Sequence, residues 1–180
     1  MDQGTEKSIG DPVAEVVGDY RAFVRAGLQK VAEKGIDVKD YPIDHLCFRV
    51  GTIEEYEKAK KALLALSKGF LENPHHGRPI SKFQLVNPLQ VDSYSIPIIE
   101  LPSPKPERKS GLEHFEMVVG EDYDGLNEKY AGLWSGIEDS GEFNKPLFIN
   151  FDDGTSVKFH KLSLDEVVRL EGNNFSPPVE

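Results

Sequence analysis

The feature that most constrains the fold is a short segment that occurs twice in the chain. Residues 44–50 (DHLCFRV) and 113–119 (EHFEMVV) each begin with an acidic residue and a histidine, and the two histidines lie sixty-nine positions apart (114 − 45). Each segment continues with apolar residues that alternate with others, which is the pattern of a half-buried β-strand. Two matching strands, each with a histidine at its start, predict a duplicated module.

Strand geometry assigns the side chains of these segments to faces. Successive residues of a strand point to opposite faces, so His45 shares its face with Cys47 and Arg49. In the second segment, His114 shares its face with Glu116. If the two modules are duplicates, we expect both polar faces to line one shared centre.

The composition excludes several classes of function. The chain of 180 residues has 31 acidic and 21 basic residues and a net charge of −10, which disfavours nucleic-acid binding because that function needs a basic face. Its single cysteine, Cys47, permits neither an intramolecular disulfide nor a thiolate zinc cluster. No apolar run reaches the length of a membrane span, and residues 1–10 lack the apolar centre of a secretory signal. These features favour a cytoplasmic protein that acts on a small molecule, and they indicate no particular oligomeric state.

The first module is predicted to read strand, helix, strand, strand, strand. Before it, Asp11 and Pro12 form a helix start, and apolar residues at three- and four-residue steps predict one helix that continues to Gly35. A capping box at residues 52–55 opens a second helix. The polar segment 73–79 is expected to be a loop. Strands are expected at residues 43–50, 70–72, 80–86 and 94–101.

The same order of elements then repeats. We expect a strand at residues 112–119, a helix at 123–134, and further strands at 137–143, 147–151 and 155–160. A tight turn with Gly154 joins the last two strands, and a capping box at residues 163–166 opens a closing helix. The chain is therefore divided, within one compact domain, into a disordered N-terminus (1–10), a helix with the first module (11–102), a proline-rich linker (103–111), the second module with the closing helix (112–171) and a tail (172–180).

Potential metal ligands occur at matching places in the two modules. The last strand of the first module ends with Glu100 and that of the second with His160, sixty positions apart (160 − 100). With His45 and His114 they form a set of three imidazoles and one carboxylate. Such a set suits Zn²⁺, Fe²⁺, Mn²⁺, Ni²⁺ or Co²⁺, and an open position would suit catalysis. Two alternatives stay open: one member lies beside the metal rather than on it, or Glu116 replaces Glu100 or His160.

Acidic neighbours complete the expected centre. Asp44, Glu113 and Glu116 could orient the imidazoles, as carboxylates around metal-bound histidines usually do. Glu116 is also the candidate general base if Glu100 is a ligand, because that role needs a carboxylate beside the metal with a pKa near the working pH.

Other polar residues carry weaker signals. Arg49, Arg78 and Lys158 are the cations expected to hold an anionic substrate, although each could instead form an ordinary surface ion pair. The histidine pair at positions 75 and 76 is expected to be a solvated part of a loop. Cys47 is expected to be a small buried core residue.

At these residues the chain resembles the YecM-like proteins of the vicinal-oxygen-chelate superfamily, relatives of glyoxalase I and extradiol dioxygenases. The resemblance covers most of residues 40–171 and implies an α+β fold. In it, two βαβββ modules form a curled mixed sheet around a metal cleft, with extra N- and C-terminal helices. The matching stretches are Asp44-His45, Gly77-Arg78-Pro79-Ile80 with Phe83 and Leu85, Glu100-Leu101-Pro102, Glu113-His114, Asp153-Gly154, Lys158-Phe159-His160 and the helix that contains Glu166.

The resemblance also implies a ligand set and a range of reactions. Ligands in this superfamily come from the first and last strands of each module, which here means His45, Glu100, His114 and His160. The chain departs from the glyoxalase pattern because His160 stands where a glutamate is common. Members isomerise, epimerise, add nucleophiles or cleave rings, and these reactions share chelation of two neighbouring substrate oxygens by the metal.

We therefore expect a divalent-metal-dependent isomerase, lyase or oxygenase that acts on a small, oxygen-rich, anionic substrate. Glu116 would act as the base, and Arg49 and Arg78 would hold the negative end of the substrate. One alternative is a non-catalytic protein that binds a small molecule or a metal in the same cleft. Another is a metal-free structural module in which Glu100 and His160 only pair with the histidines.

Overall fold

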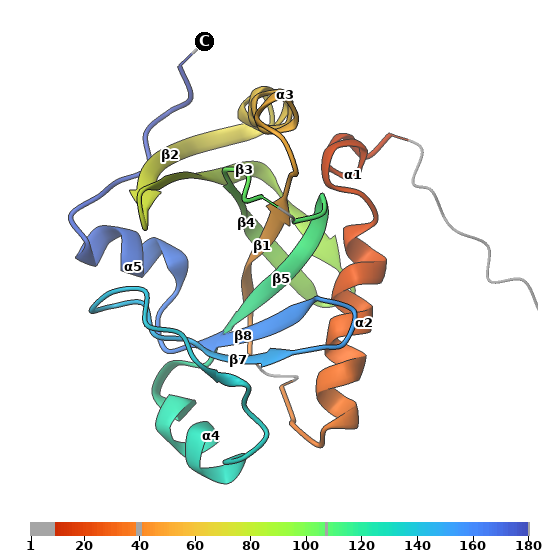
Figure 1. Ribbon diagram of the computed structural model, residues 1–180, viewed down its shortest axis with the longest axis vertical. Coiled ribbons are helices and arrows are strands. Elements are labelled where there is room, and N and C mark those ends of the chain that lie inside the picture. Colours follow the sequence, from red (N-terminus) through yellow and green to blue (C-terminus); the bar gives the residue numbers. More distant parts are fainter. Residues whose placement is uncertain (1–9, 39–40, 107, 180) are drawn as a thin grey trace, which may run out of the picture.

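The computed structural model describes residues 10–38, 41–106 and 108–179, so the N-terminus predicted to be disordered lies almost entirely outside the described residues. Eight strands form one mixed sheet in the order β2-β3-β4-β1-β5-β8-β7-β6, which curls strongly in Figure 1. The strands are β1 (Ile43–Arg49), β2 (Ser67–His75), β3 (Arg78–Val91), β4 (Tyr94–Pro102), β5 (Gly111–Val118), β6 (Gly136–Ile137), β7 (Leu147–Asn150) and β8 (Ser156–His160). The helices are α1 (Pro12–Val17), α2 (Tyr20–Glu33), α3 (Ile53–Leu64), α4 (Tyr123–Lys129) and α5 (Leu164–Leu170), with a 3-10 turn at Gly120–Asp122.

The two repeated segments form the middle of the sheet. β1 pairs antiparallel with β5, and each of them pairs on its other side with the last strand of its own module, which runs parallel to it. The predicted α+β class and the curled mixed sheet are confirmed. The register places Cys47 beside Glu100 in the first module and Glu116 beside Lys158 in the second.

The N-terminal helix was predicted to be continuous, and this prediction is wrong. Gly18 has a φ of +89°, which ends α1 and redirects the chain before α2 begins. Each helix has its own cap, because Asp11 accepts hydrogen bonds from the first turn of α1 and Asp19 accepts one from Ala22 in α2. The apolar spacing continues through the break because both helices bury the same side.

The segment 73–79 was predicted to be a loop, but most of it belongs to strands. His76 and Gly77 have φ values of +49° and +76°, and this tight turn lets His75 pair directly with Arg78. The polar side chains that suggested a loop lie at the margin of the sheet. The tail is also tied to the sheet, because Ser176 exchanges two backbone hydrogen bonds with Phe70 of β2, of 2.7 and 2.9 Å.

Two elements of the second module are shorter than predicted. The helix expected at residues 123–134 ends at Lys129, and the strand expected at 137–143 is reduced to Gly136–Ile137. The closing helix α5 begins as predicted, with the capping box of Ser163 and Glu166. Among the described helices, none combines the length and the hydropathy of a membrane span.

The helices cover opposite faces of the sheet. In Figure 1, α2 lies along one side of the curled sheet and α5 lies on the other. α2 packs on the outer face, where Phe23 meets Phe115 edge to face with ring centroids 6.1 Å apart. Gly27 of the same helix lies directly over Phe115, and a Cβ atom there would clash with the ring. The close approach of α2 to β5 therefore depends on glycine at position 27.

We expect Gly27→Ala to lower the free energy of unfolding by about 1–2 kcal/mol, because overpacking of about 1–3 kcal/mol outweighs the gain in helix propensity of up to about 1 kcal/mol. Gly125 of α4 is the matched control, since a Cβ atom there meets nothing within 4 Å. Urea unfolding should show Gly125→Ala as neutral or more stable. Equal stability of Gly27→Ala and the unchanged protein would contradict the proposed packing.

Candidate metal centre

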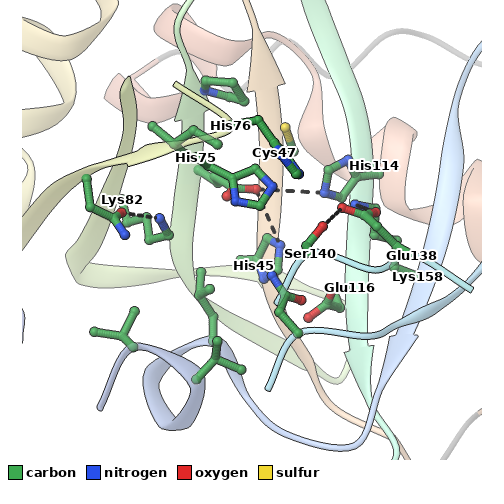
Figure 2. Close-up of a pocket in the computed structure, with 18 of the residues that line it drawn as sticks. His45, Cys47, His75, His76, Lys82, His114, Glu116, Glu138, Ser140 and Lys158 are labelled. Carbon is green, nitrogen blue, oxygen red and sulfur yellow. Dashed lines mark hydrogen bonds and ion pairs between the residues drawn. The ribbon is translucent and has the colours of Figure 1, made fainter. Parts of the chain in front are cut away.

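The inner face of the sheet lines a cleft of about 540 Å³. Its walls come from strands of both modules, from α5 and from the segment that follows β6. Figure 2 shows the polar side chains that converge there: His45, Cys47, His75, Lys82, His114, Glu116, Glu138 and Lys158. The predicted shared face of His45, Cys47 and Arg49 is thus part of this cleft.

Two imidazoles and one carboxylate approach each other at the centre of the cleft. Nε2 of His45 lies 3.8 Å from Oε2 of Glu100, and Nε2 of His114 lies 3.9 Å from the same oxygen. One donor atom from each of the three residues falls within 4.8 Å of the others. The three residues come from the adjacent strands β4, β1 and β5, so backbone hydrogen bonds hold them in place. We refer to His45, Glu100 and His114 as the triad.

The triad has the chemistry and spacing of a divalent-metal site. Bonds of about 2.1 Å to a metal would separate two ligand atoms by about 3.0–3.4 Å, so small side-chain rotations would bring all three donors to bonding distance. Two other groups of possible ligands lie nearby. In the group of Asp44, His45 and Glu116, the Asp44 carboxylate already accepts a backbone hydrogen bond from α5. The other group includes Cys47, and burial raises the pKa of its thiol well above the usual value. The triad fits a metal better than either.

The acidic residue before His45 orients that ring, as predicted from the sequence. Oδ1 of Asp44 lies 2.8 Å from Nδ1 of His45, so Nδ1 carries the proton and Nε2 faces the triad. Glu113 does not do the same for His114: its Oε1 lies 3.5 Å from Nδ1 of His114, and this buried nitrogen has no hydrogen-bond partner among the described residues. The other oxygen of Asp44 accepts the backbone N–H of Leu164 at 2.5 Å, which ties the first turn of α5 to the centre.

The electrostatic surroundings of the two histidines differ. Burial by itself would lower the pKa of His45, but the Asp44 carboxylate raises it to about 9. For His114, burial and then the ammonium of Lys158 lower the pKa to about 4. At neutral pH, His114 is therefore a neutral imidazole, the form that binds a metal, whereas His45 is protonated and would release a proton when it binds one.

The two buried glutamates have opposite pKa shifts. Burial would raise the pKa of Glu100, but His45 and Lys82 lower it to about 2, so Glu100 is an anion at neutral pH. Burial raises the pKa of Glu116 to about 8, against the attraction of His45. Glu116 is only 5% exposed and lies beside His45 in the β1–β5 ladder. One carboxylate is thus suited to bind a cation and the other to hold a proton.

The structure does not bring His160 to the triad, which corrects the predicted four-residue set. Nδ1 of His160 donates to the carbonyl oxygen of Leu162 at 2.6 Å, and Nε2 accepts the backbone N–H of Lys145 at 3.3 Å. Both ring nitrogens are therefore used in holding local backbone. Nδ1 also lies 3.7 Å from Oε1 of Glu116, which is too far for a hydrogen bond.

The strand register explains why His160 was chosen wrongly. Glu100 pairs with Cys47, two residues after the first histidine, and the equivalent position in the second module pairs with Glu116. That position is occupied by Lys158, not by His160. Duplication of the fold therefore places an ammonium where a fourth ligand would be, and Lys158 is held by Glu138 at 2.5 Å.

The three predicted substrate cations line the cleft, but two of them are already paired. Arg49 forms an ion pair with Glu113, and Lys158 forms one with Glu138. Arg78 donates one hydrogen bond to a backbone carbonyl and has no carboxylate within ion-pair distance among the described residues.

Sequence reasoning missed several residues of the cleft. Lys82 is buried, donates to Asn73 at 2.7 Å and pairs with Glu100 in the β3–β4 ladder. The alternation of side chains along the strand could have identified Lys82, because it shares a strand face with Ile80. His75 was expected to be solvated, but it is partly buried in the cleft, and burial lowers its pKa. Cys47 is fully buried, as predicted, but it lines the cleft rather than the apolar core.

Comparison with known proteins assigns the chain to a family. A model of the YecM protein family matches residues 13–152. The chain belongs to the YecM family. It is 28% identical to protein YecM of Escherichia coli K12 over 178 residues, which covers 89% of this chain and 95% of that protein. The part that matches the YecM family model includes the whole triad and ends before β8.

Two solved structures resemble this chain to different degrees. The structure of protein EC4020, from structural genomics, is 28% identical and has a TM-score of 0.68, with 89% of this chain and 93% of that chain covered. The methylmalonyl-CoA epimerase of Mycobacterium tuberculosis is 14% identical and has a TM-score of 0.45, with 71% of this chain and 93% of that chain covered.

We expect Asp44→Asn to lower the free energy of unfolding by about 1.5–3 kcal/mol, because it removes the charge from two buried hydrogen bonds. Asp165→Asn is the matched control on α5, since Asp165 is half exposed, accepts a hydrogen bond from Gln84 at 3.2 Å and pairs with Arg169 at 3.3 Å. Urea unfolding of both variants compares them directly. Equal losses of unfolding free energy in the two variants would contradict a specific contribution of Asp44 through its hydrogen bonds to His45 and Leu164.

Proposed function

We propose that this YecM-family protein is a divalent-metal-dependent enzyme that acts on a small, oxygen-rich substrate. The observation that supports this most strongly is the triad, in which two imidazoles and one anionic carboxylate share a spacing that a metal can span. Three protein ligands leave positions for two substrate oxygens, whereas a structural site would be closed by a fourth ligand. A bound divalent ion would supply a Lewis acid that draws electron density from those oxygens.

The chain's own residues supply the proton chemistry. Glu116 is buried, pairs with His45 of the triad in the β1–β5 ladder, and has a pKa near the working pH. We assign it the task of taking a proton from substrate carbon beside the chelating oxygens and returning it. The apolar side chains of α5 line that end of the cleft and shield it from water. This arrangement favours an isomerase, epimerase or lyase.

An oxygenase is the second candidate, and one observation favours it. Two histidines and one carboxylate with open positions are also the set that binds Fe²⁺ in non-haem oxygenases. The exclusion of His160 from the triad leaves this three-ligand arrangement. The identity of the bound metal would separate the two candidates.

Elemental mass spectrometry should find near-stoichiometric metal in protein purified without an affinity tag. His45→Ala, His114→Ala and Glu100→Gln should lower metal affinity by more than about tenfold, because loss of a mere orienting neighbour already costs about 10–100-fold. His160→Asn should keep its metal, since the asparagine amide can still donate to Leu162. If no metal binds, even after reconstitution with Zn²⁺, Mn²⁺, Ni²⁺ and anaerobic Fe²⁺, the enzyme proposal fails.

A second experiment tests Glu116. Metal-loaded protein should exchange the carbon-bound proton of a 2-keto or 2-hydroxy acid with D₂O, and Glu116→Gln should slow this exchange by at least about 100-fold. Proton NMR measures the exchange, and the metal content of the variant serves as the control. Saturable binding without exchange would indicate a non-catalytic binding protein. Exchange that is unchanged in Glu116→Gln would remove Glu116 from the mechanism.

A further inference from the structure

Four cations gather near one end of the cleft: Arg49, Arg78 and Lys105 line it, and Arg108 lines an adjoining pocket beside Arg49. We call them the cationic rim. Arg49 ends β1 and Arg78 begins β3, and these strand ends meet because β3 runs antiparallel to β4, which is parallel to β1. α5 lies at the other end, where Asp44 and Gln84 contact it. The cleft therefore has a closed end at α5 and a cationic opposite end.

The charge of the rim is opposite to that of the chain as a whole. The chain has a net charge of −10, yet Glu113 is the single described carboxylate within ion-pair distance of any rim cation. Glu113 contacts Arg49 and lies 3.4 Å from Arg108. Arg78 and Lys105 have no such partner among the described residues. Within the described part of the chain, two positive charges beside the cleft thus lack an ion-pair partner.

Arg78 is held in place by one arm of its guanidinium. Nη1 donates to the backbone oxygen of Ser103 at 2.6 Å, and Ser103 is buried and fixed in turn by its N–H bond to Pro79, of 2.9 Å. The remaining donors meet no acceptor among the described residues. A guanidinium fixed in this way presents its free N–H groups as a fork, which suits an anion with several oxygens.

The rim cations also repel one another. After burial, the guanidiniums of Arg49 and Arg108 lower the pKa of Arg78. The guanidinium of Arg78 is the first cause that lowers the pKa of Lys105. A bound dianion would relieve this repulsion, whereas a single carboxylate would compensate only one of the two unpaired charges.

We infer that Arg78 and Lys105 form a binding site for a phosphoryl group, and that the substrate carries this group at the end away from the triad. The second half of this inference rests on the proposed function, while the first half does not need a metal. Arg49 lies two residues from the Cys47–His114 row of the ladder, about 7 Å, and Arg78 lies four residues from Lys82, about 13 Å along β3. The substrate would therefore be a phosphorylated, oxygen-rich compound with a spacer of a few atoms between its two ends.

Metal-free protein tests the site separately from the triad. After treatment with EDTA, inorganic phosphate and pyrophosphate are titrated by isothermal calorimetry, with succinate and glutarate as carboxylate competitors. Arg78→Gln and Lys105→Gln should each weaken pyrophosphate binding by about tenfold, as expected for loss of one charge-assisted contact. Lys109→Gln is the matched control, since it removes the same charge from the same exposed segment outside the cleft lining. It should change the affinity less than twofold.

Three results would overturn the inference. They are no binding of either phosphate compound to the unchanged protein, equal weakening by Lys109→Gln and Arg78→Gln, and tighter binding of the dicarboxylates than of pyrophosphate. The failure of the metal proposal would appear elsewhere, in the metal content of the unchanged protein. Phosphate binding without any metal uptake would retain the site and reject only its link to the triad.

Discussion

The antiparallel pairing of β1 with β5 is the interaction on which the rest of the structure depends. It joins segments sixty-nine residues apart and sets Cys47 opposite His114 and His45 opposite Glu116. Because side chains alternate along a strand, a slip of one residue would turn a histidine toward α2 and an apolar side chain toward the cleft. β4 and β8 then pair with these central strands, so one register determines which residues reach the centre of the sheet.

The two faces of this sheet bury different kinds of side chain. The outer face buries apolar side chains under α2, and close approach there is allowed by Gly27. The inner face buries charges, which would be unfavourable without partners. Asp44 pairs with His45, and Lys158 pairs with Glu138. The positive charges of His45 and Lys82 stabilise the carboxylate of Glu100. This network leaves the triad free to face the cleft.

Local signals in the sequence predicted most of the fold. Alternation identified β1 and β5, and capping boxes identified the starts of α3 and α5, because these patterns depend on neighbouring residues alone. The break at Gly18 was missed because apolar spacing continues across it. The extension of β2 and β3 into residues 73–79 was missed because several polar residues there face the cleft rather than solvent. His160 was chosen wrongly since a residue count cannot reveal strand register, which depends on pairing between distant segments.

The pseudo-symmetry of the fold is broken where it matters for chemistry. Glu100 and Lys158 occupy equivalent places in the two modules, yet one is a carboxylate and the other an ammonium. A flat, enolate-like molecule seated over the triad would have a carboxylate on one side and a positive charge on the other. Its two faces would therefore be held unequally, and Glu116 would reach only one of them. Divergence at two equivalent pairs of positions, Glu100 with Lys158 and Cys47 with Glu116, thus gives the two sides of the centre different chemistry.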